Sequence, residues 1–285
     1  MGCPSFSDLG KCAKDVFKNG FNYGGANCSI TAKARKDFEL GGNLNYNFDH
    51  SKMTGLASSR FNLAHLGKMI AKYSNDGSMS LQYFFDESLV KDVDLNTVFS
   101  FNSETTIKSL ELNARYGKDE LNTFCSLSNS FESSFSGVAD FVYKYKDVFF
   151  GYQTGYDSSR NLFTHNNLGV SFNVKDIGYH FRCTSIPNEY GLSVHRKINN
   201  HLDVAINGIF AKRGSSQMWT LGIGAKYLLS EGSTFRFKID KDMQIGFSLQ
   251  QRLHDSLNLT LSFNIDCPNV QSGGHKAGLS LELEA

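Results

Sequence analysis

The sequence predicts an all-β membrane protein in which about nineteen strands form a single transmembrane β-barrel behind a short N-terminal α-helix. Three observations lead to this fold class. Apolar and polar residues alternate in many segments, turn signals recur every ~10 to 15 residues between them, and no long helical pattern interrupts the series. We therefore expect an N-terminal amphipathic helix with a glycine-containing hinge at 1–25 and the transmembrane barrel at 26–285.

The first expected element is a helix within residues 5–20, too short to span a bilayer. Its apolar side chains recur at helical spacing, and charged side chains take the opposite arc: Phe6, Leu9, Ala13, Val16 and Phe17 against Lys11, Lys14, Asp15 and Lys18. Ser5 or Ser7 is expected to cap the helix, and Gly20 to end it before a flexible joint at 21–25. The pattern fits a helix outside the barrel, on the membrane or in the lumen equally well.

The strands follow, and the stretch LNLTLSFNID at 257–266 is the clearest of them. Ten residues alternate without a break, so leucine, phenylalanine and isoleucine point to one side of the strand while asparagine, threonine, serine and aspartate point to the other. The same alternation is found in several further segments: 40–48, 79–85, 93–101, 168–174, 177–183, 219–227, 235–239 and 277–283.

A single twisted sheet of this many strands must close on itself or split in two. Closure would give a backbone diameter of ~38 Å, which side chains cannot fill, so the inner face would be wet and the outer face would meet lipid. Strands of about ten residues match the hydrocarbon thickness of a bilayer. Because alternation alone is common, a soluble double-sheet protein with one solvated face on each sheet is the competing interpretation.

Composition excludes several function classes. With 29 basic and 28 acidic residues, the formal charge of +1 favours neither nucleic acid nor anionic lipid as a partner. The first 30 residues lack an apolar signal core and contain Asp8 and Asp15, so we expect neither a secretory signal nor a transit peptide. The six cysteines show no metal-binding spacing, and most are expected to be reduced, half-buried apolar residues. Cys3 and Cys12, near an exposed N-terminus, are the better candidates if any cysteine is oxidised.

No arrangement of residues predicts catalysis, so we expect no enzyme, no catalytic residue and no metal. The eight histidines never form a metal-binding pair at helical spacing, and no phosphate-binding glycine loop occurs. Gly222-Ile223-Gly224 lies inside an expected strand, where tight packing or a bend is the better explanation. The carboxylate pairs Asp86/Glu87 and Asp119/Glu120 fall in expected turns, as solvated charges usually do.

Four stretches in chain order resemble the eukaryotic mitochondrial porin, the voltage-dependent anion channel family: DLGKCAKDVFKNG near the start, GYQTGYDSSRNLFTHNNLGVSF, LGIGAKYLL and SGGHKAGLSLELEA. The chain resembles a divergent member of this family over essentially its whole length. The resemblance implies first and last strands that pair in parallel, a gating helix in the pore, and a voltage-gated diffusion channel of the mitochondrial outer membrane. Its implied partners are membrane lipid, permeating ATP, ADP, phosphate and small ions, and a homo-oligomer.

The resemblance also assigns residues. Lys11 and Lys14 correspond to basic helix positions of the family, and Lys18 adjoins Asn19, where the family usually has lysine. The family hinge corresponds to Gly20 to Gly24, followed by Gly25, and Asn22 replaces a glycine, which predicts a stiffer hinge and altered gating. The implied nucleotide contacts, with ATP or NAD in the lumen and no resident cofactor, are Lys11, Gln244, Ile245, Gly246, Ser262, Phe263, Asn264, Ile265 and Asp266.

Departures from the family pattern bear on partners and selectivity. Ala71 stands where several members carry a lipid-facing glutamate linked to hexokinase docking, so we do not expect that partner. A family triplet associated with nucleotide handling is replaced by the stretch at 88–92. Inward acids, such as Asp94, Glu111, Glu282 and Glu284, would weaken anion preference. A poorly conducting barrel that serves as a scaffold or binding protein, and a soluble ligand-binding β-protein, are the alternative functions.

Overall fold

The structure is a computed structural model that describes residues 2–63, 66–86, 92–131, 134–214 and 216–285. A 3₁₀ turn, η1 (Phe6–Asp8), and a helix, α1 (Lys11–Lys18), precede nineteen strands. The strands are β1 (Gly25–Arg35), β2 (Phe38–Asn47), β3 (Lys52–Asn62), β4 (Lys68–Ser74), β5 (Ser78–Phe84), β6 (Val93–Asn102), β7 (Lys108–Lys118), β8 (Leu121–Ser130), β9 (Ser134–Tyr145), β10 (Val148–Asp157), β11 (Leu162–Val174), β12 (Ile177–Thr184), β13 (Glu189–Lys197), β14 (Leu202–Arg213), β15 (Ser216–Ser230), β16 (Ser233–Asp240), β17 (Gln244–His254), β18 (Leu257–Asp266) and β19 (Lys276–Glu284).

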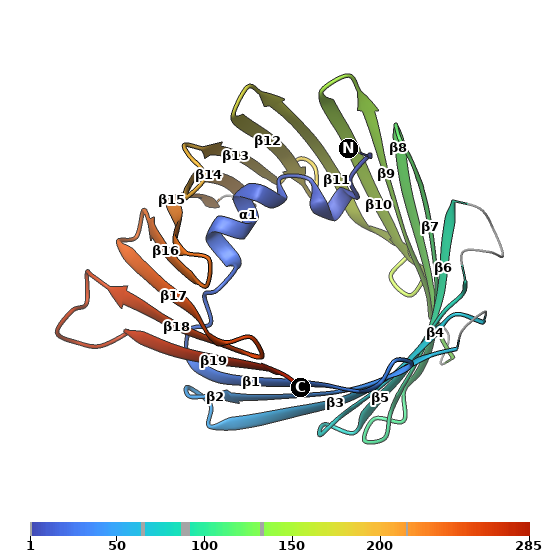
Figure 1. Ribbon diagram of the computed structural model, residues 1–285. Helices are drawn as coiled ribbons and strands as arrows, with labels where there is room; N and C mark the ends of the chain where they lie inside the picture. The colour runs from blue at the N-terminus through green and yellow to red at the C-terminus, as the bar shows by residue number, and fades with distance from the viewer. Residues whose placement is uncertain (1, 64–65, 87–91, 132–133, 215) are drawn as a thin grey trace.

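The strands form one closed barrel, as the sequence predicts (Figure 1). Each strand pairs antiparallel with the next, and the ring closes where β1 and β19 pair in parallel, from Gly25 opposite Gly278 to Thr31 opposite Glu284. The parallel seam agrees with the expectation from the resemblance. The first strand begins at Gly25, one residue before the boundary that the sequence suggests.

Strand register separates the two faces of the wall. Asn27, Thr260 and Ser280 line a cavity together with residues of the hinge, so they face the lumen, and alternation along each paired strand assigns the rest. The leucines of β18 then point outward, while Asn258, Thr260, Ser262 and Asn264 point inward. Among the described strand residues, outward Lys, Arg, Asp or Glu occurs only within two residues of a strand end, as at Lys108, Lys118, Arg196 and Lys212.

The outward face is apolar and exposed, with side chains such as Leu44, Leu112 and Phe150 accessible over nearly half of their surface. Since water would penalise so much exposed apolar surface, this face suits hydrocarbon. Among the described residues, no helix is both long and apolar enough to cross a membrane.

The densest apolar packing lies between the N-terminal segment and the inner wall. One cluster joins Cys3 and Leu9 to Val142, and a second joins Ala13 and Val16 to Ala205. The N-terminal segment therefore lies inside the barrel, against the wall (Figure 1). This placement decides among the three sites that its amphipathic pattern left open.

The N-terminal segment departs from the sequence prediction in two ways. The helix within 5–20 is interrupted, because Gly10 adopts a left-handed backbone (φ 69°) between η1 and α1, and neither Ser5 nor Ser7 caps α1. The helix ends at Lys18, with Asn19 as its C-cap, before Gly20. Cys12 is exposed as expected, but Cys3 is buried at 9% exposure, so its predicted place at an exposed N-terminus is wrong.

Candidate functional site

The lumen and the segment docked in it form the candidate site. The segment starts at the wall strands β8 and β9, where the Cys3 carbonyl accepts a hydrogen bond from Asn122 Nδ2 at 3.1 Å and the Cys3 thiol donates to the Val142 carbonyl at 3.4 Å. The Ser5 hydroxyl donates to Asp8 Oδ2 at 2.6 Å, and Lys11 Nζ lies 3.5 Å from Asp8 Oδ1. These contacts hold the first turn beside the wall.

Wall glycines admit the apolar side of the segment. A Cβ atom at Gly151 would lie 2.6 Å from Leu9 Cδ1, and one at Gly224 would lie 3.0 Å from Val16 Cγ1. Gly169 and Gly222 make similar approaches to Leu9 and Phe17. Since these distances are shorter than ordinary van der Waals contact, the helix can lie this close only to a wall that lacks side chains here. The sequence expectation of tight packing at Gly222 and Gly224 agrees with this contact.

Gly10 is required for a second reason besides its backbone angle. A Cβ atom there would lie 2.4 Å from the ring of His180, a buried luminal residue of β12. The loop before α1 therefore rests directly on an imidazole of the wall, and any side chain at this position would separate the two.

The hinge is fastened to the wall by hydrogen bonds. Ser248 Oγ donates to the Gly20 carbonyl at 2.5 Å, and Asn22 Nδ2 donates to the Leu279 carbonyl at 3.4 Å. The Ser262 hydroxyl also contacts the Asn22 backbone. Gly20 and Gly24 have left-handed backbones but Asn22 does not, so the asparagine fits this position without strain. The predicted stiffening by Asn22 stays a prediction.

Two cations of β16 face the hinge, the buried Arg236 and the half-buried Lys238. Lys238 Nζ donates to the Phe17 carbonyl, in the last turn of α1, at 3.0 Å, and it lies 4.0 Å from the centroid of the Phe21 ring. Arg236 donates to Gln250 Oε1 at 3.1 Å. The positive charge of Lys238 is favourable beside the negative end of the helix dipole. Sequence reasoning missed this role because Lys238 appears only as one of several polar strand residues.

The predicted basic residues of the helix differ in exposure. Lys11 and Lys18 are exposed to the lumen, whereas Lys14 is half-buried and donates to the Ser7 carbonyl at 2.9 Å. Burial, with Arg182 and Lys18 nearby, lowers the pKa of Lys14 below its ordinary value. The hinge residues Gly20, Gly24 and Gly25 connect this helix to the wall.

The predicted nucleotide-contact residues divide between the two faces of the wall. Lys11, Gln244, Gly246, Ser262, Asn264 and Asp266 lie on the luminal side, and Ile245, Phe263 and Ile265 point outward. Ser262 is buried against the Asn22 backbone, so within the first group a solute in the pore can reach only the side chains that the hinge does not cover. Gly246 lies under the Tyr23 hydroxyl, so the hinge covers it. The contacts themselves stay predictions.

The structure also places the departures from the family pattern. Ala71 points outward from β4, the side on which the corresponding glutamate would lie. Of the replaced triplet region, 88–91 lies outside the described residues. The acids Asp94, Glu111, Glu282 and Glu284 are luminal. Within the described residues, no group of three or more His, Cys, Asp or Glu could hold a metal ion.

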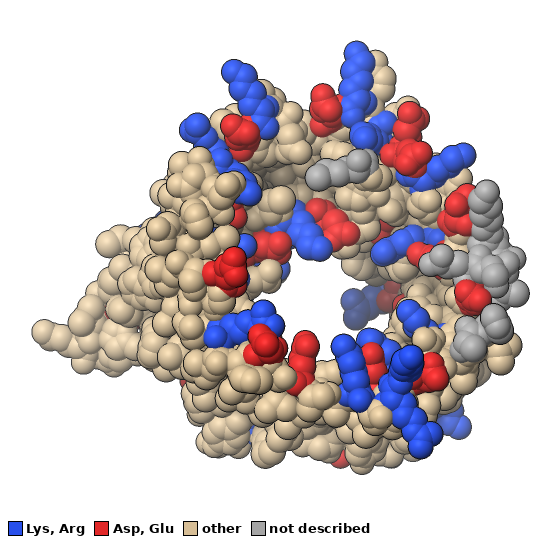
Figure 2. Space-filling model, in the orientation of Figure 1, with Lys and Arg blue, Asp and Glu red and all other residues tan. Residues whose placement is uncertain are grey.

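A wide opening passes through the molecule, and its rim carries both basic and acidic side chains (Figure 2). The segment lies along the inner wall of β8 to β19 and leaves β2 to β7 bare (Figure 1). The arrangement supplies a charged wall for passing solutes, with one amphipathic segment docked in the lumen.

Comparison with known proteins agrees with this geometry. The chain matches the family model described as "Eukaryotic porin" over residues 2–278. A Meleagris gallopavo protein named "Non-selective voltage-gated ion channel VDAC2" is 29% identical over 284 residues, covering 99% of this chain and 94% of its own length. The "Voltage-dependent anion-selective channel" of Drosophila melanogaster is 28% identical and covers 100% of both chains. The human "Non-selective voltage-gated ion channel VDAC1" is 27% identical and covers 99% of both.

Proposed function

The chain belongs to the eukaryotic porin family, and from this premise we propose that it forms a voltage-gated diffusion channel of the mitochondrial outer membrane. It passes metabolites such as ATP, ADP and phosphate, together with small ions. The observation that carries the proposal is the open lumen (Figure 2), and the charged N-terminal segment lies along one side of it (Figure 1).

Voltage sensitivity follows from where the movable charges lie. Lys11, Lys14, Asp15 and Lys18 are carried on one short helix, so a displacement of the helix moves net positive charge through the field across the membrane. The helix is attached through the hinge and through two small apolar clusters, rather than through a continuous hydrogen-bonded strand. Such an attachment can open without breaking the barrel.

The balance of luminal charge supports a preference for anions. Basic side chains on the luminal face of the strands outnumber acidic ones: Lys33, Lys52, Arg60, Lys68, Lys72, Arg115, Lys144, Arg182, Lys197, Lys226, Arg236, Lys238, Arg252 and Lys276 against Glu39, Asp94, Glu111, Asp140, Asp157, Glu189, Asp203, Asp240, Asp266, Glu282 and Glu284. The N-terminal helix adds more lysine than aspartate. A positive lumen raises the local concentration of anions without binding them tightly. We therefore expect a modest anion preference even though the whole chain has a formal charge of only +1.

Planar-bilayer recording of the purified chain tests the proposal. We expect a large conductance that falls at high voltage of either sign, and a reversal potential under a salt gradient whose sign indicates a preference for chloride over potassium. A protein that inserts into bilayers yet gives no conductance would instead be a scaffold or binding protein. Protein that carbonate extracts from mitochondrial membranes would contradict the transmembrane assignment, and a reversal potential at zero would contradict the preference for anions.

A further inference from the structure

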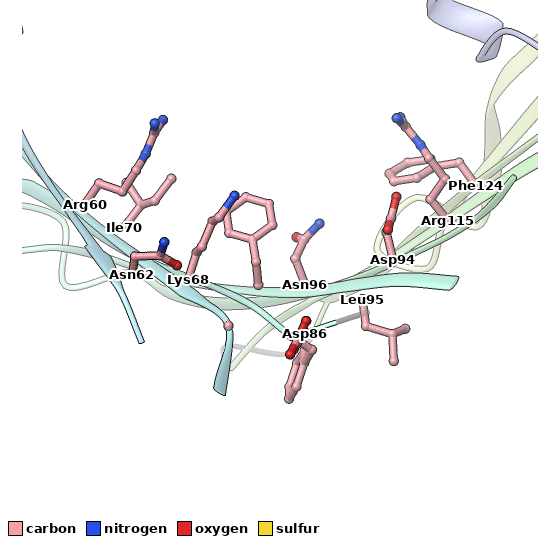
Figure 3. Close-up of a pocket in the computed structure, with 13 residues that line it drawn as sticks. Arg60, Asn62, Lys68, Ile70, Asp86, Asp94, Leu95, Asn96, Arg115 and Phe124 are labelled. Carbon is pink, nitrogen blue, oxygen red and sulfur yellow. The ribbon is translucent and has the colours of Figure 1, made fainter. Parts of the chain in front are cut away.

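The wall that the N-terminal segment leaves bare has its own binding features. A hollow of about 690 Å³ lies against β3 to β8, and Arg60, Lys68, Phe84, Asn96, Arg115 and Phe124 are among its lining residues. Figure 3 shows Arg60 of β3, Lys68 of β4, Asn96 of β6 and Arg115 of β7 reaching into the lumen, whereas Leu95 points away. This hollow is separate from the hinge and from the predicted contacts on β17 and β18.

Strand register orders these side chains into two adjoining rows. Lys68 of β4, Phe84 of β5 and Asn96 of β6 stand opposite one another in turn. One residue pair further along, Asp94 of β6, Arg115 of β7 and Phe124 of β8 form a second row. From β4 to β8 the rows extend over ~19 Å of wall, since neighbouring strands lie ~4.8 Å apart. The array can therefore contact a long ligand at two separate points.

One end of the array suits a polyphosphate. Lys68 is exposed and forms no ion pair with any residue that the structure describes. Arg60, on the adjacent strand, contacts Glu39 at 2.9 Å through one nitrogen of its guanidinium group. The other nitrogens of that group remain available, and Arg60 and Lys68 together combine a planar fork with a compact ammonium, the two groups that proteins use to bind phosphate.

The other end suits a flat aromatic ring. The guanidinium carbon of Arg115 lies 5.6 Å from the centroid of the Phe124 ring, so the two side chains form a planar surface of mixed charge and aromatic character. Nucleobases stack on such surfaces. Asp94 stands beside Arg115 and repels phosphate there. Asp86 also lines the hollow, beside Gly67, so an acid stands near each end. The orientation follows instead from the pair Arg60 and Lys68 at one end and the Arg115–Phe124 surface at the other, with phosphates toward β3 and β4 and the base toward β7 and β8.

We propose that this part of the wall is a transit site for nucleoside triphosphates, with the phosphates on Arg60 and Lys68 and the base against Arg115 and Phe124. The site rests on the proposed channel function and gives permeating nucleotides a binding position independent of the N-terminal helix. All the cations involved are exposed to the lumen, so binding is weak and release is fast. A channel requires this, because tight binding would stop flux.

ATP-dependent current noise of the purified full-length channel in planar bilayers measures the apparent affinity and residence time. The double variant Arg60→Gln/Lys68→Gln is compared with Lys72→Gln/Arg252→Gln, which removes the same charges elsewhere in the lumen. Lys72 lies on the same face of β4, and Arg252 has an acidic partner, Asp255, as Arg60 has Glu39. We expect the first pair to lower the ATP affinity by roughly fivefold and the control pair to change it by less than about twofold.

The base contact needs its own comparison. Phe124→Leu is expected to lower the apparent affinity for ATP by about threefold and to leave the affinity for inorganic tripolyphosphate unchanged. Phe124→Tyr is expected to retain the wild-type affinity for both ligands. If the two double variants lost ATP affinity equally, the effect would be long-range electrostatics and the site would be refuted. The site would also be refuted if Phe124→Leu lost affinity for ATP and for tripolyphosphate equally. A wild-type chain without conductance would refute the channel itself, whereas a conducting chain without ATP-dependent noise would refute only the transit site.

Discussion

Asn22 and Ser262 hold the hinge to the wall through two hydrogen bonds that share one hydroxyl. The Asn22 backbone N–H donates to Ser262 Oγ at 3.2 Å, and the same Oγ donates to the Asn22 carbonyl at 2.9 Å. Ser262 is almost completely buried, at 1% exposure, so water cannot replace these bonds while the hinge is docked. A single strand residue thus fixes both polar groups of one hinge peptide position.

Ser262→Ala should loosen the hinge without opening the barrel. Loss of the hydroxyl leaves two buried backbone groups unpaired and weakens docking by about 1 kcal/mol, which is roughly a fivefold change in population. Amide hydrogen exchange at Asn22, measured by NMR in micelles, should accelerate by that factor. Ser126→Ala is the matched control, since its hydroxyl donates to Glu111 Oε1 at 3.1 Å on a distant part of the wall. Equal acceleration in both variants would contradict the assignment.

Gly224→Val should displace α1 from the wall. The new side chain would meet Val16 and Phe17, and overpacking of this kind costs about 1–3 kcal/mol. Pulsed EPR between a spin label on Cys12 and one on the wall should show a broader and longer distance distribution. Gly208→Val is the control, because its Cβ would point outward and lie 3.8 Å from Leu221 Cδ1. An unchanged distribution in Gly224→Val would show that the wall glycines are not needed for docking.

Cys3 and Cys12 should differ sharply in reactivity toward a water-soluble maleimide. Cys12 is exposed on α1, whereas burial raises the pKa of the Cys3 thiol and so lowers its thiolate fraction. In variants that retain one of these cysteines, with the other five replaced by serine, Cys12 should label at least about tenfold faster at neutral pH. Asn122→Ala, which removes the hydrogen bond to the Cys3 carbonyl, should accelerate Cys3 alone. Similar rates for the two thiols would refute the docking of the first residues.

Acid should release the first turn through Asp8. The hydrogen bond from the Ser5 hydroxyl, with Lys11 as a further contributor, lowers the pKa of Asp8 below its ordinary value. The stabilisation is therefore complete above the unfolded pKa of ~3.9 and is lost as the pH falls through the lower folded value. NMR shifts of Ser5 and Asp8 should follow this loss, whereas Asp8→Asn should resemble the acid state already at pH ~6. Coincident titration curves for the two proteins would contradict this cause.

The alternation of residues predicted the barrel because residues on the outer face of the wall must be apolar and residues on the inner face can be polar. From Leu257 to Asp266, every second residue must be compatible with hydrocarbon, and the residues between them with water. Such a demand repeats at each strand and is visible in a single sequence. The strand count and the transmembrane closure follow from this repetition and from the absence of helical segments.

The position of the helix could not be predicted in the same way. The apolar side chains from Phe6 to Phe17 could be buried against any apolar surface, so their pattern does not specify where the helix docks. The missing information lies in its partner. The luminal glycines lie in two patches, Gly151 and Gly169 on the neighbouring strands β10 and β11 and Gly222 and Gly224 on β15, and the two patches face one helical segment only when the sheet curves into a barrel. Glycines at inward positions were the available signal, and the burial of Cys3 had none.

The pairing of β1 with β19 has a consequence for how the protein reaches a membrane. Gly25 and Gly278 can pair only after nearly the entire polypeptide has been synthesised, so no shorter N-terminal fragment can close the barrel in this way. A fragment would expose two rows of bare amides and carbonyls to hydrocarbon, and each such group costs several kcal/mol there. Insertion must therefore be a concerted, post-translational event. The final strand of nine residues decides whether the preceding eighteen can exist in a bilayer at all.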